Sequence, residues 1–339
     1  MTNEIIYDRL SRPLRDLRIS VMDRCNFRCS YCMPKEIFGK DYVFMKENEL
    51  LTFEEIFRVA KQVASLGVNK LRITGGEPLL RKNVDLLVKD LYTIDGITDI
   101  ALTTNGVLLP KFATALKAAG LDRVNVSLDA LNPLVFQEMS GRNTTAETVL
   151  KGIEAAQEAG LGVKVNMVVK RGVNEEEVVP LARYCKDHNI PLRFIEFMDV
   201  GQTNGWNYSK VVSKKELYKQ VETIAPLEAV EENYFGEVAS RYRYQDSLAE
   251  VGFISSVTET FCGTCTRARI SADGKLFTCL FSESGTDFKT DLRTGISDKA
   301  LKAKLTSVWE QRSDRYSELR TEESSKLRKK LRCPTLADD

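Results

Sequence analysis

The sequence predicts an α/β protein, built as an open, partial (β/α)6 barrel of the TIM type with a smaller C-terminal region. Two observations predict this fold: apolar, β-rich segments recur six times, and most are followed by a stretch with helical periodicity. Crossovers between parallel strands are almost always right-handed, so consecutive units curl the same way. Six units are too few for a closed eight-stranded barrel. A flat, doubly wound sheet is the alternative architecture.

The six strands are expected where apolar and β-branched residues concentrate. They cover residues 17–22, 70–74, 97–103, 123–128, 162–169 and 192–198. Parallel strands carry their active sites in the loops that follow them, in a barrel as in an open sheet. We therefore expect the functional residues at the C-terminal ends of these strands.

The clearest helix is expected over residues 53–64, where apolar side chains recur at a spacing of three and four residues. Thr52 and Glu55 form a capping box at its start, since each can bind a free backbone N–H of the first turn. The same pattern marks three further helix starts: Thr144/Glu147, Asn174/Glu177 and Ser213/Glu216. Three glycines stand where helices are expected to stop: Gly67, Gly120 and Gly160.

The repeating pattern ends after about residue 225. The remaining apolar segments are short and scattered, at 229–235, 242–244, 251–255 and 268–271. We therefore expect two regions, a barrel over residues 1–225 and a C-terminal region with little repetitive structure over residues 226–339. A length of 339 residues agrees with this division, at about 150 residues per domain.

The charge balance counts against two classes of protein. The 49 Lys and Arg residues nearly match the 48 Asp and Glu residues, so the net charge is +1. Proteins dedicated to nucleic acids or membrane surfaces usually carry a strong basic bias, and neither partner is expected here. The N-terminal segment has charges such as Asp8 and Arg12 where a secretory signal would be apolar, and no run approaches the ~18 apolar residues of a membrane helix. We expect a cytoplasmic protein with reduced thiols.

Eight cysteines stand against a single histidine in this sequence. The first expected strand is followed directly by a cysteine triad with C-x3-C-x2-C spacing, and a second triad lies near the C-terminus. Their members are Cys25, Cys29 and Cys32 in the first triad, and Cys262, Cys265 and Cys279 in the second. Such close spacing lets a loop wrap several thiolates around one inorganic centre.

Two kinds of centre are compatible with three cysteines. Structural zinc usually takes four Cys or His ligands, so each triad is one ligand short, although an acidic residue, Cys185 or Cys333 could complete a site. The only histidine, His188, is expected at a helix end away from both triads. Two [4Fe–4S] clusters, each with three Cys ligands and one open iron, fit the count better.

The first triad, with Tyr31 before its last cysteine, resembles the signature of the radical S-adenosylmethionine (SAM) superfamily. One β/α unit later, Gly75-Gly76-Glu77-Pro78 at the end of the second strand resembles that superfamily's GGEP motif. Glycine lets the backbone approach a ligand closely, and the carboxylate beside it suits the ammonium group of SAM. The two motifs follow each other in the order that the superfamily has.

The second triad narrows the resemblance to one family. Its stretch Cys262-Gly-Thr-Cys265-Thr-Arg267-Ala-Arg269, followed by Cys279, is similar to the C-terminal signature of the GTP 3′,8-cyclases of molybdenum cofactor biosynthesis. The resemblance extends from residue 17 to about residue 319. Further matching stretches are 72–78, 103–106, 125–129 and 193–198.

The resemblance implies contact residues for SAM and for GTP. It implies that SAM is surrounded by Tyr31, Gly76, Ser127 and Met198, and that GTP is surrounded by Arg18, Arg72, Thr103, Lys164, Arg267 and Arg269. Several of these cations interrupt apolar strands, where a buried charge needs a partner. Lys70 and Arg193 are added as GTP candidates from their strand positions alone. No G-x4-G-K-[ST] sequence is present, so a P-loop is not expected.

The resemblance also implies the chemistry. A reduced cluster on the first triad cleaves SAM to methionine and a 5′-deoxyadenosyl radical, which takes the 3′ hydrogen of GTP. The ribose carbon then bonds to C8 of the guanine, giving 3′,8-cyclo-7,8-dihydro-GTP, while the second cluster holds the guanine through its open iron. The implied partners are a flavodoxin-like electron donor and a downstream pterin-forming enzyme, with a homodimer as a further option.

The C-terminus departs from that family. Family members end in a Gly-Gly tail that reaches the active site, whereas this chain ends Arg332-Cys-Pro-Thr-Leu-Ala-Asp-Asp339. Because the tail lies outside the core motifs, the departure bears on turnover and leaves the expected fold, clusters and substrate binding in place.

Two other functions fit parts of the pattern. A radical SAM enzyme that modifies peptides shares the first triad, but it usually carries more C-terminal cysteines, and the Arg267-x-Arg269 pair favours a phosphorylated substrate. A non-catalytic binding module stabilised by zinc or by a cluster is the second alternative. It predicts about two zinc ions per chain, whereas the enzyme predicts about eight irons.

Overall fold

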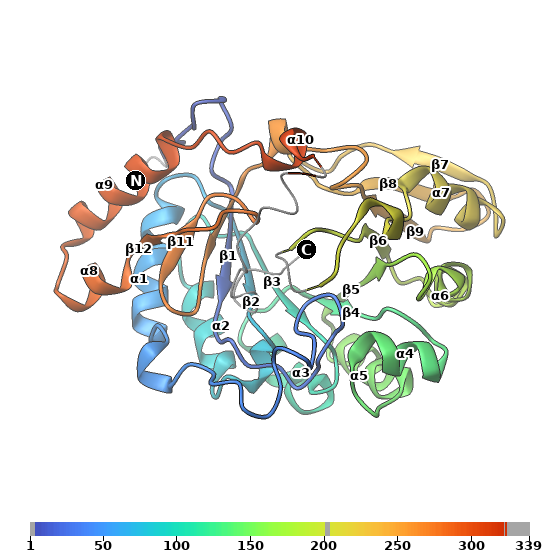
Figure 1. Ribbon diagram of the computed structural model, residues 1–339. Coiled ribbons are helices and arrows are strands. Elements are labelled where there is room, and N and C mark those ends of the chain that lie inside the picture. Colours follow the sequence, from blue (N-terminus) through green and yellow to red (C-terminus); the bar gives the residue numbers. More distant parts are fainter. Residues whose placement is uncertain (1–3, 201–203, 322, 324–339) are drawn as a thin grey trace.

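The six expected strands form the parallel centre of one sheet in this computed structural model, which describes residues 4–200, 204–321 and 323 (Figure 1). Each strand pairs in parallel with the next one along the chain. They are β1 (Asp16–Ser20), β2 (Lys70–Thr74), β3 (Asp99–Thr104), β4 (Arg123–Ser127), β5 (Gly162–Val169) and β6 (Leu192–Glu196). The predicted β/α repeat is confirmed, with strand ends shifted by no more than two residues.

Helices follow the strands and lie on the outside of the curved sheet (Figure 1). They are α1 (Phe53–Ala64), α2 (Val84–Tyr92), α3 (Leu109–Ala118), α4 (Pro133–Ser140), α5 (Ala146–Glu158), α6 (Val178–Asp187) and α7 (Lys214–Glu222), with α8 (Lys289–Arg293), α9 (Asp298–Glu310) and α10 (Tyr316–Leu319) near the C-terminus. Short 3-10 helices cover η1 (Glu47–Glu49), η2 (Pro78–Leu80), η3 (Glu175–Glu177), η4 (Tyr208–Lys210) and η5 (Cys262–Thr264). The helix expected over residues 53–64 is confirmed at both ends.

Two of the four expected capping boxes are confirmed, namely Thr52/Glu55 and Ser213/Glu216. The box expected at Thr144 is wrong, because α5 begins after Thr145, whose side chain makes no capping bond. Asn174 makes no capping bond either, since its amide donates to the carbonyl oxygens of Asp129 and Val168 and so joins two loops. The three glycines expected at helix ends all have positive φ: Gly67, Gly120 and Gly160.

The C-terminal part of the chain extends the same sheet at both edges. On one side β9 (Glu250–Ile254) pairs in parallel with β6, and β8 (Ser240–Tyr244) and β7 (Leu227–Val230) continue antiparallel. On the other side β10 (Arg267–Ile270) pairs in parallel with β1 and leads to β11 (Lys275–Phe277) and β12 (Thr286–Asp287). The expectation of little repetitive structure there is wrong, because such short strands leave a weak pattern and pair with distant partners. The division at residue 225 stays a prediction.

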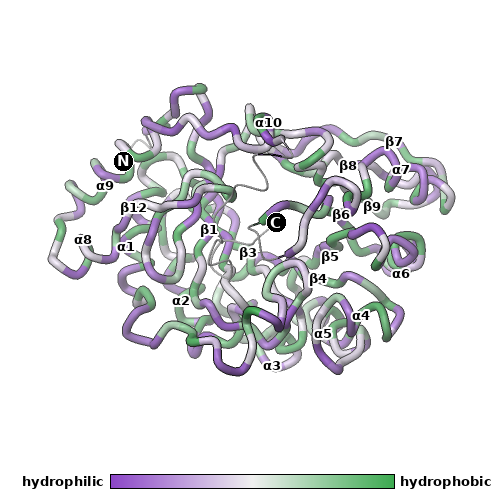
Figure 2. Tube along the Cα trace, viewed as in Figure 1, coloured by the Kyte–Doolittle hydropathy of each residue, from purple (hydrophilic) through white to green (hydrophobic). Residues whose placement is uncertain are grey.

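Alternation along the strands separates an apolar core from a polar barrel interior. Leu17 and Ile19 of β1 are fully buried in the apolar cluster between the sheet and the helices. Arg18 lies between them and therefore points to the opposite face, as does Arg72, its register partner on β2. Figure 2 shows apolar and hydrophilic stretches alternating along the helices around the sheet. The charged residues of these strands thus lie on the inner face of the barrel, because the outer face of the sheet packs against the helices in the apolar core.

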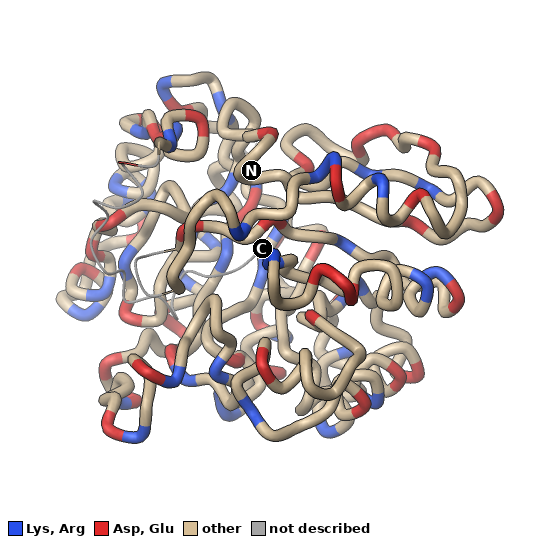
Figure 3. Tube along the Cα trace, turned by 45° about the vertical axis from the view of Figure 1, so that its right-hand side comes forward, with Lys and Arg blue, Asp and Glu red and all other residues tan. Residues whose placement is uncertain are grey.

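Charged residues of both signs are interspersed on the outer elements, and basic residues also lie on the central strands (Figure 3). No helix among the described residues is both long and apolar enough to cross a membrane. The unusual C-terminal sequence, with Cys333, lies outside the residues that the structure describes.

Candidate functional site

The first cysteine triad lines a cavity near the C-terminal ends of the parallel strands, which we call the thiol cavity. Its lining includes all the residues that the resemblance assigned to the first cluster and to SAM: Cys25, Cys29, Cys32, Tyr31, Gly76, Ser127 and Met198. The structure therefore brings together residues spread over more than half of the chain. Their position also agrees with the expected location of functional residues at the strand ends.

Two hydrogen bonds to the carboxylate of Asp129 connect the cysteine loop to the barrel. The hydroxyl of Tyr31 donates to Oδ2 of Asp129 over 2.9 Å, and Oδ1 of Asp129 accepts from the backbone N–H of Val168 over 2.9 Å. Burial raises the pKa of the Asp129 carboxyl to about 6 in spite of these bonds. Tyr31 thus has a structural role in orienting the cysteine loop, beside any contact with SAM.

The glycine turn after β2 packs directly on the backbone of the cysteine loop. A Cβ on Gly76 would lie 2.2 Å from the carbonyl oxygen of Arg24, so no other residue fits there without displacement. The carboxylate of Glu77 is buried and accepts hydrogen bonds from Thr104 Oγ1 and from the backbone N–H groups of Leu79 and Asn105. These bonds tie two loops together, and the expectation that this carboxylate suits the ammonium group of SAM stays a prediction, since Glu77 also lines the thiol cavity.

A second cavity, of about 700 Å³, lies toward the N-terminal ends of the strands, and we call it the cation cavity. This volume is within the range of small-molecule sites. Six of the eight expected GTP residues line it: Arg18, Lys70, Arg72, Lys164, Arg193 and Arg267. Thr103 lies in the thiol cavity and Arg269 beside the second triad. The expectation that functional residues lie at the C-terminal ends of the strands therefore holds for the thiol cavity but not for the cation cavity. The interior of the open barrel is polar along its whole length, so candidate residues also lie near the other ends of the strands.

Arg193 is held in the cation cavity by neutral partners. Its Nε donates to Oδ1 of Asn166 over 2.9 Å, and its Nη2 donates to Oδ1 of Asn125 over 2.7 Å. Neither amide cancels the positive charge. The Nδ2 of Asn125 is buried with no hydrogen-bond partner among the described residues, so it remains available as a donor in the barrel interior.

The basic residues of the cation cavity lower one another's pKa values. Burial, together with Arg72 and Arg123, lowers the pKa of Arg193 to about 9. Burial, together with Arg193 and Arg123, lowers the pKa of Lys164 to about 8. Such mutual repulsion marks a site that is electrostatically incomplete without an anion. Arg123 also forms an ion pair with Asp99, so the cavity is not purely basic.

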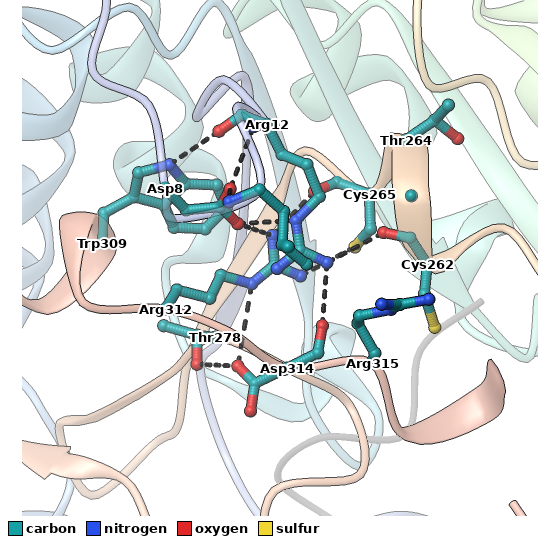
Figure 4. A network of polar contacts seen from close by, with 12 residues as sticks. Asp8, Arg12, Cys262, Thr264, Cys265, Thr278, Trp309, Arg312, Asp314 and Arg315 are labelled. Atoms are coloured by element: carbon teal, nitrogen blue, oxygen red, sulfur yellow. Dashed lines mark hydrogen bonds and ion pairs between the residues drawn. The ribbon is translucent and has the colours of Figure 1, made fainter. Parts of the chain in front are cut away.

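A third, smaller cavity is lined by the second triad, Cys262, Cys265 and Cys279, and we call it the second-triad cavity. Arg267, Arg269 and Arg312 surround the same space. Burial raises the pKa of the Cys265 thiol, but the three arginines together lower it to about 6. Nη2 of Arg267 and Nη2 of Arg312 each lie 3.2 Å from the Cys265 sulfur. Arg312 and Cys265 are labelled in Figure 4.

The second-triad cavity shares lining residues with each of the other two cavities. Met198 and Leu280 line both the thiol cavity and the second-triad cavity. Arg267 lines both the cation cavity and the second-triad cavity. Along β4, the inward residues Arg123 and Ser127 line the cation and thiol cavities respectively, with Asn125 between them. One elongated ligand could therefore reach all three.

Comparison with known proteins identifies the family. The radical SAM superfamily model matches residues 19–185, and the model named Molybdenum Cofactor Synthesis C matches residues 190–318. A curated GTP 3′,8-cyclase of Staphylococcus haemolyticus is 54% identical over 326 residues, 96% of each chain. Those of Staphylococcus epidermidis and Staphylococcus aureus are 56% identical over 94% and 52% identical over 97% of each chain.

This chain belongs to the GTP 3′,8-cyclase family. Among solved structures, the fold resembles Streptococcus suis SuiB bound to S-adenosylmethionine, with a TM-score of 0.60 and 18% identity over 87% of this chain and 68% of that chain. It also resembles methylornithine synthase, with a TM-score of 0.50 and 15% identity over 62% of each chain. At such identities the likeness extends to the fold alone.

Membership of the GTP 3′,8-cyclase family makes the protein a radical SAM enzyme, and that superfamily implies SAM and a [4Fe–4S] cluster. The first triad fits such a cluster. Burial and the neighbouring Glu77 raise the pKa of Cys25 to about 12, and burial, Asp129 and the two other cysteines raise that of Cys29. Crowded, buried thiolates of this kind are stabilised by iron.

Among the described residues, no group of three or more His, Cys, Asp or Glu side chains could hold one metal ion. Thiolates of a cubane cluster bind separate irons and need not converge on one point. His188 is the C-terminal cap of α6 and stacks on Tyr184, so the described contacts agree with its expected place at a helix end.

Sequence patterns missed several residues of this GTP 3′,8-cyclase family member. Arg123, Asn125 and Asn166 point into the barrel, and their alternation with apolar neighbours on β4 and β5 was the available signal. Asp8 and Arg312 lie beside the second triad, and no local pattern distinguishes them from surface charges. Only the tertiary structure brings these two together.

Proposed function

We propose that this chain converts GTP to 3′,8-cyclo-7,8-dihydro-GTP, the first step of molybdenum cofactor biosynthesis, with SAM as co-substrate. One observation carries the proposal: the thiol cavity and the cation cavity, which six of the expected cations line, each share lining residues with the second-triad cavity inside one barrel. A nucleoside triphosphate has the charge for the second and the length to approach the first.

In the thiol cavity, Cys25, Cys29 and Cys32 would hold a [4Fe–4S] cluster, which supplies the electron that cleaves SAM when bound. Gly76, Ser127 and Met198 would surround SAM, and Tyr31 would orient the cysteine loop through Asp129. The hydroxyl of Thr103 has no partner among the described residues and would bind a polar group of one of the two small molecules. The apolar lining excludes water from a reactive radical.

In the cation cavity, the basic residues would bind the triphosphate. They are Arg18, Lys70, Arg72, Lys164, Arg193 and Arg267. Arginine suits this task because its planar guanidinium donates two parallel hydrogen bonds to phosphate. Asn125, between the cavities, would donate to the ribose or to the α-phosphate.

In the second-triad cavity, Cys262, Cys265 and Cys279 would hold a second [4Fe–4S] cluster, whose fourth, open iron would face the guanine. The lowered pKa of Cys265 supports this donor set, because iron binds the thiolate form. Arg269, on the same wall, would contact the nucleotide.

The proposal includes partners and a location that follow from the chemistry. A flavodoxin-like protein would supply electrons, a pterin-forming enzyme would consume the product, and a cytoplasmic location would keep the thiols reduced. A homodimer and a division of the chain at residue 225 remain parts of the same proposal.

The experiment is anaerobic incubation of the iron-replete, reduced chain with SAM, with and without GTP. We expect 5′-deoxyadenosine only when GTP is present. The chain is assayed as it stands and with Gly-Gly added at its C-terminus. Cleavage of SAM at full rate without GTP, or no cleavage by either form, would contradict the proposal.

A further inference from the structure

Three buried charged side chains meet behind the loop that carries the second triad, and no motif contains them (Figure 4). Asp8 and Arg12 come from the N-terminal segment, and Arg312 comes from the segment after α9. At most 1% of any of these side chains is exposed. Burying charges is costly unless they are paired and hydrogen-bonded, so their contacts identify their task.

Arg12 joins the cysteine loop to the N-terminal segment and to the segment after α9. Its Nε donates to Oδ2 of Asp8 over 2.6 Å, while its Nη1 donates to the carbonyl oxygens of Cys262 and Asp314, both over 2.8 Å. Its own carbonyl oxygen accepts from Trp309 Nε1 over 3.1 Å. Arg12 therefore binds the backbone of the loop, through the carbonyl oxygen of Cys262, rather than a cysteine sulfur.

Arg312 reaches the sulfur itself. Its Nη1 donates to the carbonyl oxygen of Cys265 over 2.7 Å and lies 3.3 Å from Oδ2 of Asp8. Its Nη2 lies 3.2 Å from the sulfur of Cys265, within hydrogen-bond distance for a thiolate acceptor. The guanidinium also stacks on Trp309, with 4.6 Å to the ring centroid. Asp8, the ring and the backbone carbonyl together fix its direction.

Arg312 and Arg267 contact the same sulfur from different sides. Arg267 also lines the cation cavity, so a bound triphosphate competes with the sulfur for its guanidinium. Arg312 does not line that cavity, and its remaining partners are Asp8 and Asp314. Of the two arginines, Arg312 is therefore the one that a triphosphate in the cation cavity would not draw away from Cys265.

We infer that Arg312, oriented by Asp8, is a positioning residue for the proposed second cluster. Its N–H donates to the Cys265 sulfur and withdraws electron density from it. Hydrogen bonds to cluster sulfurs raise the reduction potential, and such supporting residues typically change metal affinity about 10- to 100-fold. The inference rests on the second cluster of the proposed function.

The test uses the full chain with Cys25, Cys29 and Cys32 all replaced by Ser, so that only the second cluster remains. Potentiometry followed by electron paramagnetic resonance gives its midpoint potential, and transfer of iron to a chelator gives its stability. For Arg312→Met we expect a more negative potential and about 10- to 100-fold faster loss of iron. Asp8→Asn should shift both in the same direction, by less.

Two controls separate positioning from folding. Arg58→Met removes an arginine of α1 from a half-exposed ion pair with Asp298 of α9 and should change neither quantity. Arg312→Lys keeps a charge and the fold, but one ammonium cannot replace both guanidinium contacts, so its potential should still fall. Circular dichroism checks that each variant is folded.

The outcomes distinguish this inference from the proposed function. Unchanged potential and unchanged iron release in both Arg312→Met and Arg312→Lys, with the cluster present, would overturn the role of Arg312 alone. If the starting chain binds no iron at the second triad, the second cluster itself fails, and this inference fails with it. GTP-dependent SAM cleavage is scored separately in the otherwise unchanged chain.

Discussion

At the residue scale, the cation cavity is defined by side chains whose charges are left available. Arg193 is the clearest case, because the oxygens of Asn125 and Asn166 hold its guanidinium without neutralising it. A carboxylate in either place would have satisfied Arg193 and removed the attraction for phosphate. The interior of the barrel therefore has a positive electrostatic potential, which attracts a polyanion.

Lys164 makes this electrostatic account testable by pH. Its pKa of about 8 means that the ammonium is present at pH 7, half lost at about pH 8 and largely lost by about pH 9, so that binding a triphosphate at such pH values requires uptake of a proton. GTP affinity, measured by calorimetry, should therefore fall between about pH 7 and 8.5. Lys164→Arg should flatten this slope, since a guanidinium stays charged. An equal slope in both proteins would exclude Lys164 as its source.

The cysteines offer a matched pair of substitutions. Cys29→Ser should remove about four of about eight irons per chain and abolish SAM cleavage, because a hydroxyl does not replace a thiolate ligand. Cys185 is equally a free thiol but is buried in the apolar core on α6, so Cys185→Ser should keep all iron and lose only stability. Equal iron contents in the two variants would contradict the assignment of the first triad.

At the element scale, strand alternation and helix capping explain why the sequence folds into this barrel. On β1 the apolar residues face the helices and Arg18 faces inward, so one strand serves both the core and the site. These short-range patterns made the six β/α units predictable. The strands β7 to β12 were not predictable in the same way, because their pairing with β1 and β6 depends on contacts between distant segments.

Two threonines test the capping argument. Thr52 accepts a hydrogen bond from the N–H of Glu55 at the start of α1, so Thr52→Ala should lower the free energy of unfolding by about 1 kcal/mol in urea titrations. Thr145 caps α5 without any side-chain bond, and Thr145→Ala should have a much smaller effect. Neither change should alter GTP affinity. Equal losses of stability would show that the bond at Thr52 contributes nothing specific.

At the scale of the whole molecule, one sheet brings together residues from the entire chain. The motifs predicted the fold, both cysteine triads and most of the cation cavity, since each is a local pattern on a strand or loop. They did not predict that Glu77 ties loops together or that Arg312 reaches the Cys265 sulfur. Both contacts join segments far apart in the sequence, so the residues next to Glu77 or Arg312 in the chain do not predict them.

The proposed function requires that the ribose of GTP lies beside the adenosyl group of SAM, where the second-triad cavity joins the thiol cavity to the cation cavity. The most direct measurement is mass spectrometry of 5′-deoxyadenosine formed from GTP deuterated at the 3′ position. We expect one deuterium in the 5′-deoxyadenosine. Abundant 5′-deoxyadenosine that carries no deuterium from the 3′ position would contradict it.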